Sequence, residues 1–128
     1  MDECIDYIVE LIDESVINLP LTITNNIQED GRITQPIALA VKGKVLTLAA
    51  SPLFNGNGDY RDWIDGRGRQ LVSVTYDKEK WGKAAQALKE AIDVAHLAGY
   101  KLYKYNKEAD GQFNMSDSIA LLMNTRKG

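Results

Sequence analysis

The spacing of apolar residues along the 128-residue chain predicts an all-α fold. Apolar side chains recur every three or four residues over residues 2–17, 34–50 and 77–98, as they do on the buried face of a helix. A shorter pattern of the same kind predicts a last helix over residues 117–124. Capping residues stand at the expected beginnings of these four segments: Asp2, Thr34, Asp77 and Ser116.

The apolar faces of the first two helices differ. The first helix has a broad apolar face, on which Cys4 is expected to lie buried as a small apolar residue. From Ile37 to Ala50 the second helix is apolar almost all round, which predicts neighbours on several sides. Its small residues form a stripe that would let another helix approach closely: Ala40, Gly43, Thr47 and Ala50. If the chain supplies few neighbours, we expect exposed apolar surface on this helix and self-association of the chain.

A long irregular segment, about residues 53–76, separates the second and third helices. Turn-forming residues fill most of it, and residues 71–74 could form a short strand. Tyr60 and Trp63 are candidate ligand-binding residues, because sugar binding needs flat aromatic faces with polar groups such as Asp62 and Asp65 beside them. We favour the simpler interpretation that both rings anchor the loop on the helices, since a loop of this length needs apolar anchors.

Composition and charge exclude several classes of function. The net charge of -3 gives no electrostatic footprint for nucleic acid. No apolar run is long enough to cross a bilayer, and a single cysteine excludes an intrachain disulfide. His96 is the only histidine, and no serine or cysteine elbow lies near it in the sequence. We therefore expect no enzyme and no bound metal or cofactor.

The start of the irregular segment has the spacing that opens an EF-hand calcium loop, in Asn55, Asn57 and Asp59. The pattern then requires a glycine and a bidentate glutamate at positions where this chain has Tyr60 and Gly66. Both requirements fail, so we interpret the segment as a turn-rich surface loop.

Three stretches, taken together, resemble one family of proteins. They are Gly31–Thr34 with the apolar helix that follows and ends in AASPLFN (Ala49–Asn55), TYDKEKW (Thr75–Trp81), and Gly99–Tyr103. Their order and spacing resemble the SusD/RagB family of outer-membrane proteins. The resemblance covers nearly the whole chain, and it departs from the family's pattern at Gly43, where alanine is usual.

The resemblance implies an architecture of tetratricopeptide-like helix pairs. Residues 34–50 and 77–98 would form one pair, with the loop of about residues 53–76 inserted between them. Residues 1–128 would then be a single, incomplete helical region of a longer protein. We expect this segment itself to be soluble and to carry neither a signal peptide nor a lipid anchor.

The resemblance also implies a function. Members of the family are non-catalytic lipoproteins at the outer membrane, on the cell surface, where they hold an oligosaccharide or another nutrient over a TonB-dependent transporter. The glycan-binding loops of the family have no match in this sequence, so no binding residue is transferred from them. The alternative, from a different class, is a free-standing helical-repeat module that binds a protein partner through a groove.

Overall fold

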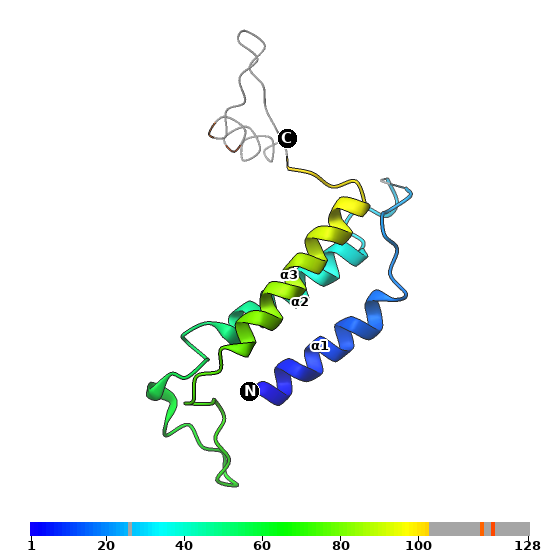
Figure 1. The fold of residues 1–128 in the computed structure, drawn as a ribbon. Helices are drawn as coiled ribbons and strands as arrows, with labels where there is room; N and C mark the ends of the chain where they lie inside the picture. The colour runs from blue at the N-terminus through cyan, green and yellow to red at the C-terminus, as the bar shows by residue number, and fades with distance from the viewer. Residues whose placement is uncertain (26, 103–115, 117–118, 120–128) are drawn as a thin grey trace.

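The computed structural model describes residues 1–25, 27–102, 116 and 119. Within that part the chain is all-α, as predicted, and it contains no β-strand. Its elements are α1 (Asp2–Val16), α2 (Gln35–Ala50), the short 3-10 turn η1 (Gly58–Tyr60) and α3 (Glu79–Leu97), shown in Figure 1. The expected last helix, residues 117–124, lies outside the described residues apart from residue 119.

The three helices run up, down and up, so that α2 is antiparallel to both α1 and α3 (Figure 1). α3 packs against α2 along its length, and α1 packs against α2 less extensively. The pair expected from residues 34–50 and 77–98 is therefore present. The segment between the two helices has no helix beyond η1, which agrees with an inserted loop.

Small side chains bring α2 and α3 together. Gly43 lies directly beneath Leu88, as expected for a stripe of small residues, whereas Ala40 from the same stripe is exposed. The buried apolar residues of the described chain are mostly alanines: Ala38, Leu39, Ala49, Ala50, Val72, Ala84, Ala87 and Ala91. Alanines bury little apolar area each, so this core stabilises the pair through close approach more than through the amount of apolar surface removed from water.

Part of the apolar surface of α2 is uncovered, as expected. Ile37, Val41 and Leu48 are exposed, and they share one side of the helix. The side of α2 toward Leu39 and Gly43 is buried. Two helices cover only part of the circumference of a third, which explains why a helix that is apolar all round retains exposed apolar residues here.

The expectation that Cys4 is buried is wrong, because Cys4 is exposed and no residue of α1 is fully buried. α1 turns one narrow side toward α2, on which four residues are half-buried: Ile5, Val9, Ile12 and Val16. Its broad apolar face is wider than the single seam that α2 provides. Cys4 falls on the uncovered part of that face.

Lys42 joins all three helices. Its Nζ lies 2.6 Å from Asp13 Oδ1 on α1 and 3.6 Å from Glu90 Oε2 on α3. Burial alone would lower the pKa of Lys42, but the hydrogen bond and charge of Asp13, together with Glu90, raise it above its ordinary value. α1 is therefore held on the pair by charge as well as by its apolar seam.

The beginnings of the first two helices differ from the expected caps. Met1 takes the capping position of α1, and Asp2 instead pairs with Lys80 of α3 at 2.9 Å. Thr34 does stand at the capping position of α2, but its hydroxyl makes no capping bond there. Pro36, two residues on, has no N–H to offer, and the buried Thr34 Oγ1 has no hydrogen-bond partner in the described part of the chain.

The predicted C-terminal end of α3 at Gly99 is confirmed, whereas the capping position at its start is Lys78, one residue after the expected Asp77. Asp77 Oδ1 accepts a hydrogen bond from the backbone N–H of Glu79, the first residue of the helix, at 2.8 Å. Gly99 has a φ of 81° at the other end. The Gly99 N–H donates to His96 O at 3.0 Å and the Tyr100 N–H donates to Ala95 O at 2.9 Å, which is a Schellman ending.

The short strand expected at residues 71–74 is not formed. The only bridge in the described chain joins Ile64 and Gln70 inside the loop. Val72 is nonetheless buried, with 4% of its surface exposed. An alternating apolar pattern needs a neighbouring strand for its hydrogen bonds, and this loop supplies none. Among the described residues, no helix has the length and apolar character needed to traverse a membrane.

Candidate functional site

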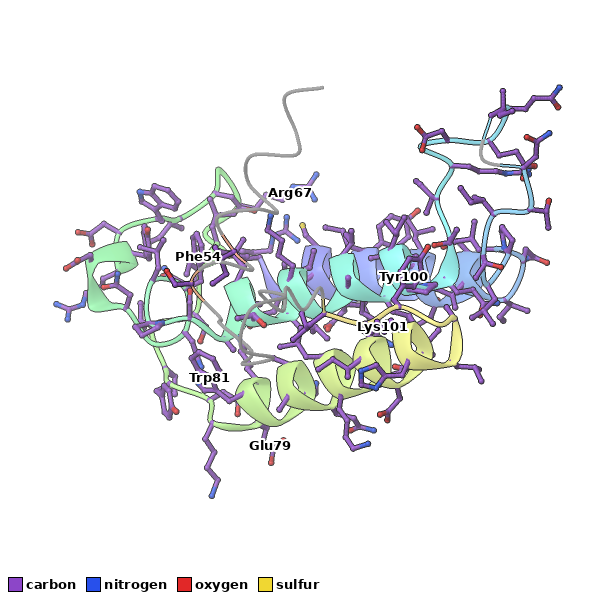
Figure 2. The ribbon with its side chains drawn as sticks, turned by 90° about the horizontal axis from the view of Figure 1, so that it is seen from above. Phe54, Arg67, Glu79, Trp81, Tyr100 and Lys101 are labelled. Carbon is purple, nitrogen blue, oxygen red and sulfur yellow. The ribbon has the colours of Figure 1, made fainter. Side chains whose placement is uncertain are left out.

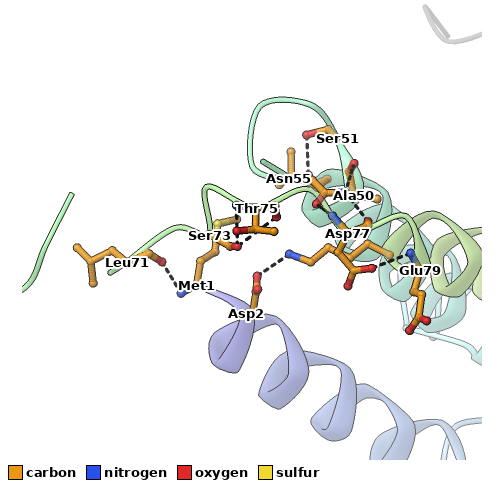
Figure 3. A network of polar contacts seen from close by, with 12 residues as sticks. Met1, Asp2, Ala50, Ser51, Asn55, Leu71, Ser73, Thr75, Asp77 and Glu79 are labelled. Atoms are coloured by element: carbon orange, nitrogen blue, oxygen red, sulfur yellow. Dashed lines mark hydrogen bonds and ion pairs between the residues drawn. The ribbon is translucent and has the colours of Figure 1, made fainter. Parts of the chain in front are cut away.

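The inserted loop is closed at its neck by the side chain of Asn55, which is buried with 3% of its surface exposed. Its Oδ1 accepts from the Asp77 N–H at 2.8 Å, and its Nδ2 donates to Asp77 O at 2.8 Å. The same Nδ2 also lies 3.3 Å from Ala50 O, at the end of α2 (Figure 3). One amide group therefore joins the end of α2 to the start of α3.

Gly56 follows Asn55 and lets the two sides of the neck approach closely. Its φ is 85°, in the left-handed region that favours glycine. A Cβ on Gly56 would stand 2.8 Å from the backbone N and Cα of Tyr76, so no side chain fits there. The Gly56 N–H also donates to Ser73 O at 3.4 Å. The neck thus depends on two adjacent residues, an amide side chain and a glycine.

The tip of the loop is organised by Asp65. Its Oδ1 accepts from the backbone N–H groups of Arg67 at 2.8 Å and Arg69 at 2.9 Å, and its Oδ2 accepts from Arg69 Nε at 2.8 Å. The backbone bond from Arg69, then its guanidinium, and also the backbone bond from Arg67 hold the pKa of Asp65 below its ordinary value. Both oxygens of this carboxylate are engaged within the loop.

An aromatic row links the loop to the end of α2. The rings of Phe54 and Tyr60 are nearly parallel, with 6.1 Å between their centroids. The rings of Tyr60 and Trp63 are tilted by 49° and lie 4.7 Å apart. Gln70 and Leu71 fix the backbone of the row, because Gln70 Nε2 donates to Tyr60 O at 2.6 Å and the Leu71 N–H donates to Trp63 O at 2.9 Å.

The two candidate residues, Tyr60 and Trp63, are thus neighbours with different surroundings. Tyr60 is half-buried between two rings, which is what an anchor requires. Trp63 has 54% of its surface exposed, and the ring that it contacts is that of Tyr60. Its geometry fits a stacking surface as well as an anchor. Asp62 is exposed nearby, whereas Asp65 is committed to the loop tip.

Phe54 is part of this row, and sequence reasoning did not select it as a site residue. It lies beside the end of α2 (Figure 2), one position before Asn55. The available signal was its place in AASPLFN, immediately before the loop. A phenylalanine there predicts apolar contact but does not say which ring of the loop it meets.

The other polar candidates have local roles. Asn57 Oδ1 accepts from the Asp59 N–H at 3.0 Å and caps η1, while the side chain of Asn55 closes the neck. The residues with calcium-loop spacing therefore make separate hydrogen bonds within the chain. His96 is exposed in the last turn of α3. In the described ranges no three His, Cys, Asp or Glu side chains come close enough together to hold a metal ion.

Two crevices lie where α1 meets the helix pair. One, of about 300 Å³, is lined by Asp6 and Val9 of α1, by Lys42 and Leu46 of α2, and by residues of α3 that include Lys83 and Glu90. The other, of about 170 Å³, is lined by Asp2, Lys80 and their neighbours. Both combine opposite charges that already face one another, as expected for a docking seam between helices.

Comparison with known proteins gives a structural likeness. No family model and no curated protein matches the chain. Solved structures that it resembles include BT4246, with 43% sequence identity, and selenomethionine BT4246, with 40%. Each likeness covers 82% of this chain with a TM-score of 0.72. This chain spans 18% of the length of either structure, so the likeness is to one part of a much longer protein.

Proposed function

We propose that this chain is part of a non-catalytic, cell-surface nutrient-binding protein of the SusD/RagB class, which holds a glycan for a TonB-dependent transporter. The observation that carries the proposal is the place of the family-like run Gly31–Asn55 in the fold. It leads into α2, supplies the buried Ala49 and Ala50 at the end of that helix, and ends in the asparagine that closes the loop. The likeness to 18% of the longer BT4246 chain agrees with a part of a larger protein.

In this proposal the helix pair is a scaffold and the inserted loop is the part that reaches the ligand. Trp63 is the residue best placed to stack on a sugar ring, because its exposed face carries negative charge density that attracts the C–H groups of a pyranose. Tyr60 supports Trp63 from behind, and Phe54 supports Tyr60. The protein would therefore bind sugars through apolar ring faces supplemented by exposed polar groups such as Asp62.

The test uses the full-length protein that contains this segment. Tagged at its C-terminus and purified from outer membranes, it should carry a TonB-dependent transporter with it and should bind oligosaccharides in titration calorimetry. Trp63→Ala should weaken that binding at least tenfold, whereas Trp81→Ala, which removes an exposed tryptophan from α3, should leave it unchanged. A protein found in the cytoplasm, or one that binds no glycan, would contradict the proposal.

The isolated 128-residue chain provides a second measurement. We expect it to bind oligosaccharides weakly or not at all, because a site in a protein of this class draws on several segments. Tight binding of any oligosaccharide to the isolated chain would contradict the scaffold interpretation.

One observation favours the alternative of a helical-repeat interaction module. The uncovered apolar residues of α2 and α3 resemble the unpaired face of a repeat that binds a protein. The two functions differ in the reading frame around the segment. A frame that continues on both sides, with a lipoprotein signal upstream, supports the nutrient-binding proposal, whereas a frame confined to the helical unit supports the module.

A further inference from the structure

The outer side of α1 presents an apolar face with an acidic edge. Tyr7 is 60% exposed and Leu11 is 46% exposed, on the side away from the half-buried seam with α2. We call this the acidic-edged face. Its apolar members are Cys4, Tyr7, Ile8 and Leu11, and its edge is formed by exposed carboxylates one helical step further round: Glu3, Glu10 and Glu14.

The helix pair presents a second apolar face, with an edge of opposite charge. Trp81 lies in the first turn of α3 (Figure 2), and three exposed residues follow it at helical spacing: Ala85, Leu88 and Ile92. Exposed lysines border this stripe: Lys78 and Lys89 on α3, and Lys44 on α2. We call these residues together the lysine-edged face. The carboxylate of Asp93 lies near this edge and is paired with Lys89 at 2.7 Å.

The two faces lie on different sides of the three-helix unit. The residues of α3 that line the crevices with α1 are Lys80, Lys83, Gln86, Ala87 and Glu90. The stripe that begins at Trp81 lies on roughly the opposite side of α3 from them, since successive residues of a helix are separated by about 100°. α1 therefore cannot cover the lysine-edged face of its own chain, and the helix pair cannot cover the outer side of α1.

The charges of the two faces are complementary. α1 carries six carboxylates and no basic residue, whereas α2 carries two lysines and no acid. The chain already uses this chemistry within itself, because Asp2 and Asp13 of α1 pair with Lys80 and Lys42 beside an apolar seam. A second pairing of an acidic helix with a lysine-bordered one therefore repeats a contact whose geometry the fold demonstrates.

We propose that copies of this chain associate head to tail, with the acidic-edged face of one copy docked on the lysine-edged face of the next. Each contact buries apolar residues of both copies and sets Glu10 and Glu14 against Lys44 and Lys78. Like faces repel, because two acidic edges or two lysine edges would then meet. A contact between unlike faces leaves one face of each kind free, so the association is open-ended. This property belongs to the 128-residue chain and does not depend on the proposed ligand.

Sedimentation velocity on the isolated chain tests the proposal. The average mass should rise with concentration beyond that of a dimer, and added salt should reduce it, because the edge charges are solvent-exposed. Glu10→Lys/Glu14→Lys and Lys44→Glu/Lys78→Glu should each be monomeric alone, and an equimolar mixture of the two should associate again. Asp30→Lys/Asp59→Lys, a matched reversal of two exposed loop carboxylates, should behave like the unaltered chain.

Three results would overturn the proposal. They are a strictly monomeric unaltered chain, a mass that stops at the dimer, and association that survives either pair of charge reversals. Circular dichroism on each variant checks that the helices are retained. If a variant loses its helices, the test is the effect of salt on the unaltered chain. Association that salt leaves unchanged or strengthens would contradict a contact between charged edges.

Discussion

Leu88 lies over Gly43 so closely that a β-carbon on the glycine would stand 2.5 Å from Leu88 Cδ2 and 3.0 Å from its Cγ. Real carbon contacts are longer, so an alanine at position 43 must displace the leucine. A glycine inside a helix costs about 1 kcal/mol relative to alanine. The short distance between α2 and α3 is therefore obtained at the expense of helix propensity.

The effect of Gly43→Ala should depend on Leu88. In a Leu88→Ala background the change should stabilise the chain by about 1 kcal/mol, since the propensity gain is then unopposed. In the unaltered chain the displaced leucine should cancel or reverse that gain, which gives a coupling between the two sites of about 1–2 kcal/mol. Urea unfolding followed by circular dichroism measures both effects. Equal effects in the two backgrounds would show that Leu88 does not restrict position 43.

Asn55→Ala should destabilise the chain by about 2 kcal/mol, because it leaves buried backbone groups without partners. Asn55→Asp should cost more, since a carboxylate cannot donate to Asp77 O or Ala50 O and places a charge where 3% of the residue is exposed. Asn18→Ala, at an exposed position after α1, is the control and should change stability little. Thermal unfolding of the three variants distinguishes a structural neck from a dispensable contact.

Alanine substitutions at three glycines of the loop distinguish the effect of backbone strain on stability from the effect of steric crowding. Gly56→Ala should destabilise most, because Gly56 has a positive φ and its Cβ would meet the Tyr76 backbone at 2.8 Å. Gly68→Ala should cost only the strain of its φ of 78°, about 1 kcal/mol. Gly66→Ala meets neither obstacle and should stay within about 0.5 kcal/mol of the unaltered chain. A different order in the measured free energies of unfolding would contradict the described neck.

Acid should loosen the loop tip before it unfolds the helices. The pKa of Asp65 is lowered in the folded chain. Its contribution to the stability of the loop tip is therefore fully present above the ordinary pKa of 3.8 and is lost as pH falls through the lower folded pKa. Amide chemical shifts of Arg67 and Arg69 should therefore change together below about pH 4. Asp65→Asn keeps the Oδ1 acceptor and removes the titration, so its amides should be insensitive to pH in that range. Identical titrations in both proteins would exclude Asp65 as the cause.

The helices could be predicted from the sequence, because a 3.6-residue period is a local property. The end of α3 could be predicted from Gly99, and its capping position could be predicted from Asp77 to within one residue. Burial was harder to predict, since it depends on how many neighbours a helix has. The apolar face of α1 is wide enough for two partners and has one in the described chain, which is why Cys4 is exposed.

The neck, and the contact that joins the aromatic row to the end of α2, could not be predicted from the sequence. As a candidate site residue, Asn55 was considered for its spacing from Asn57 and Asp59, whereas its actual partner is the backbone of Asp77, 22 residues away. A backbone partner leaves no trace in side-chain types. The contact between Tyr60 and Trp63 follows from their spacing across η1, whereas that between Phe54 and Tyr60 needs the loop to turn back toward α2.

The neck has a consequence for how the loop can change. The side-chain amide of Asn55 binds the backbone N–H and carbonyl of Asp77, and Gly56 allows the close approach beside it, so the helix pair is joined before the loop begins. Residues 57–70 can be replaced, lengthened or shortened with little effect on α2 and α3, because closing a longer loop costs only about 0.6 kcal/mol for each doubling of its length. A different recognition loop could therefore be grafted between positions 57 and 70 while α2, α3 and the residues that join them stay the same.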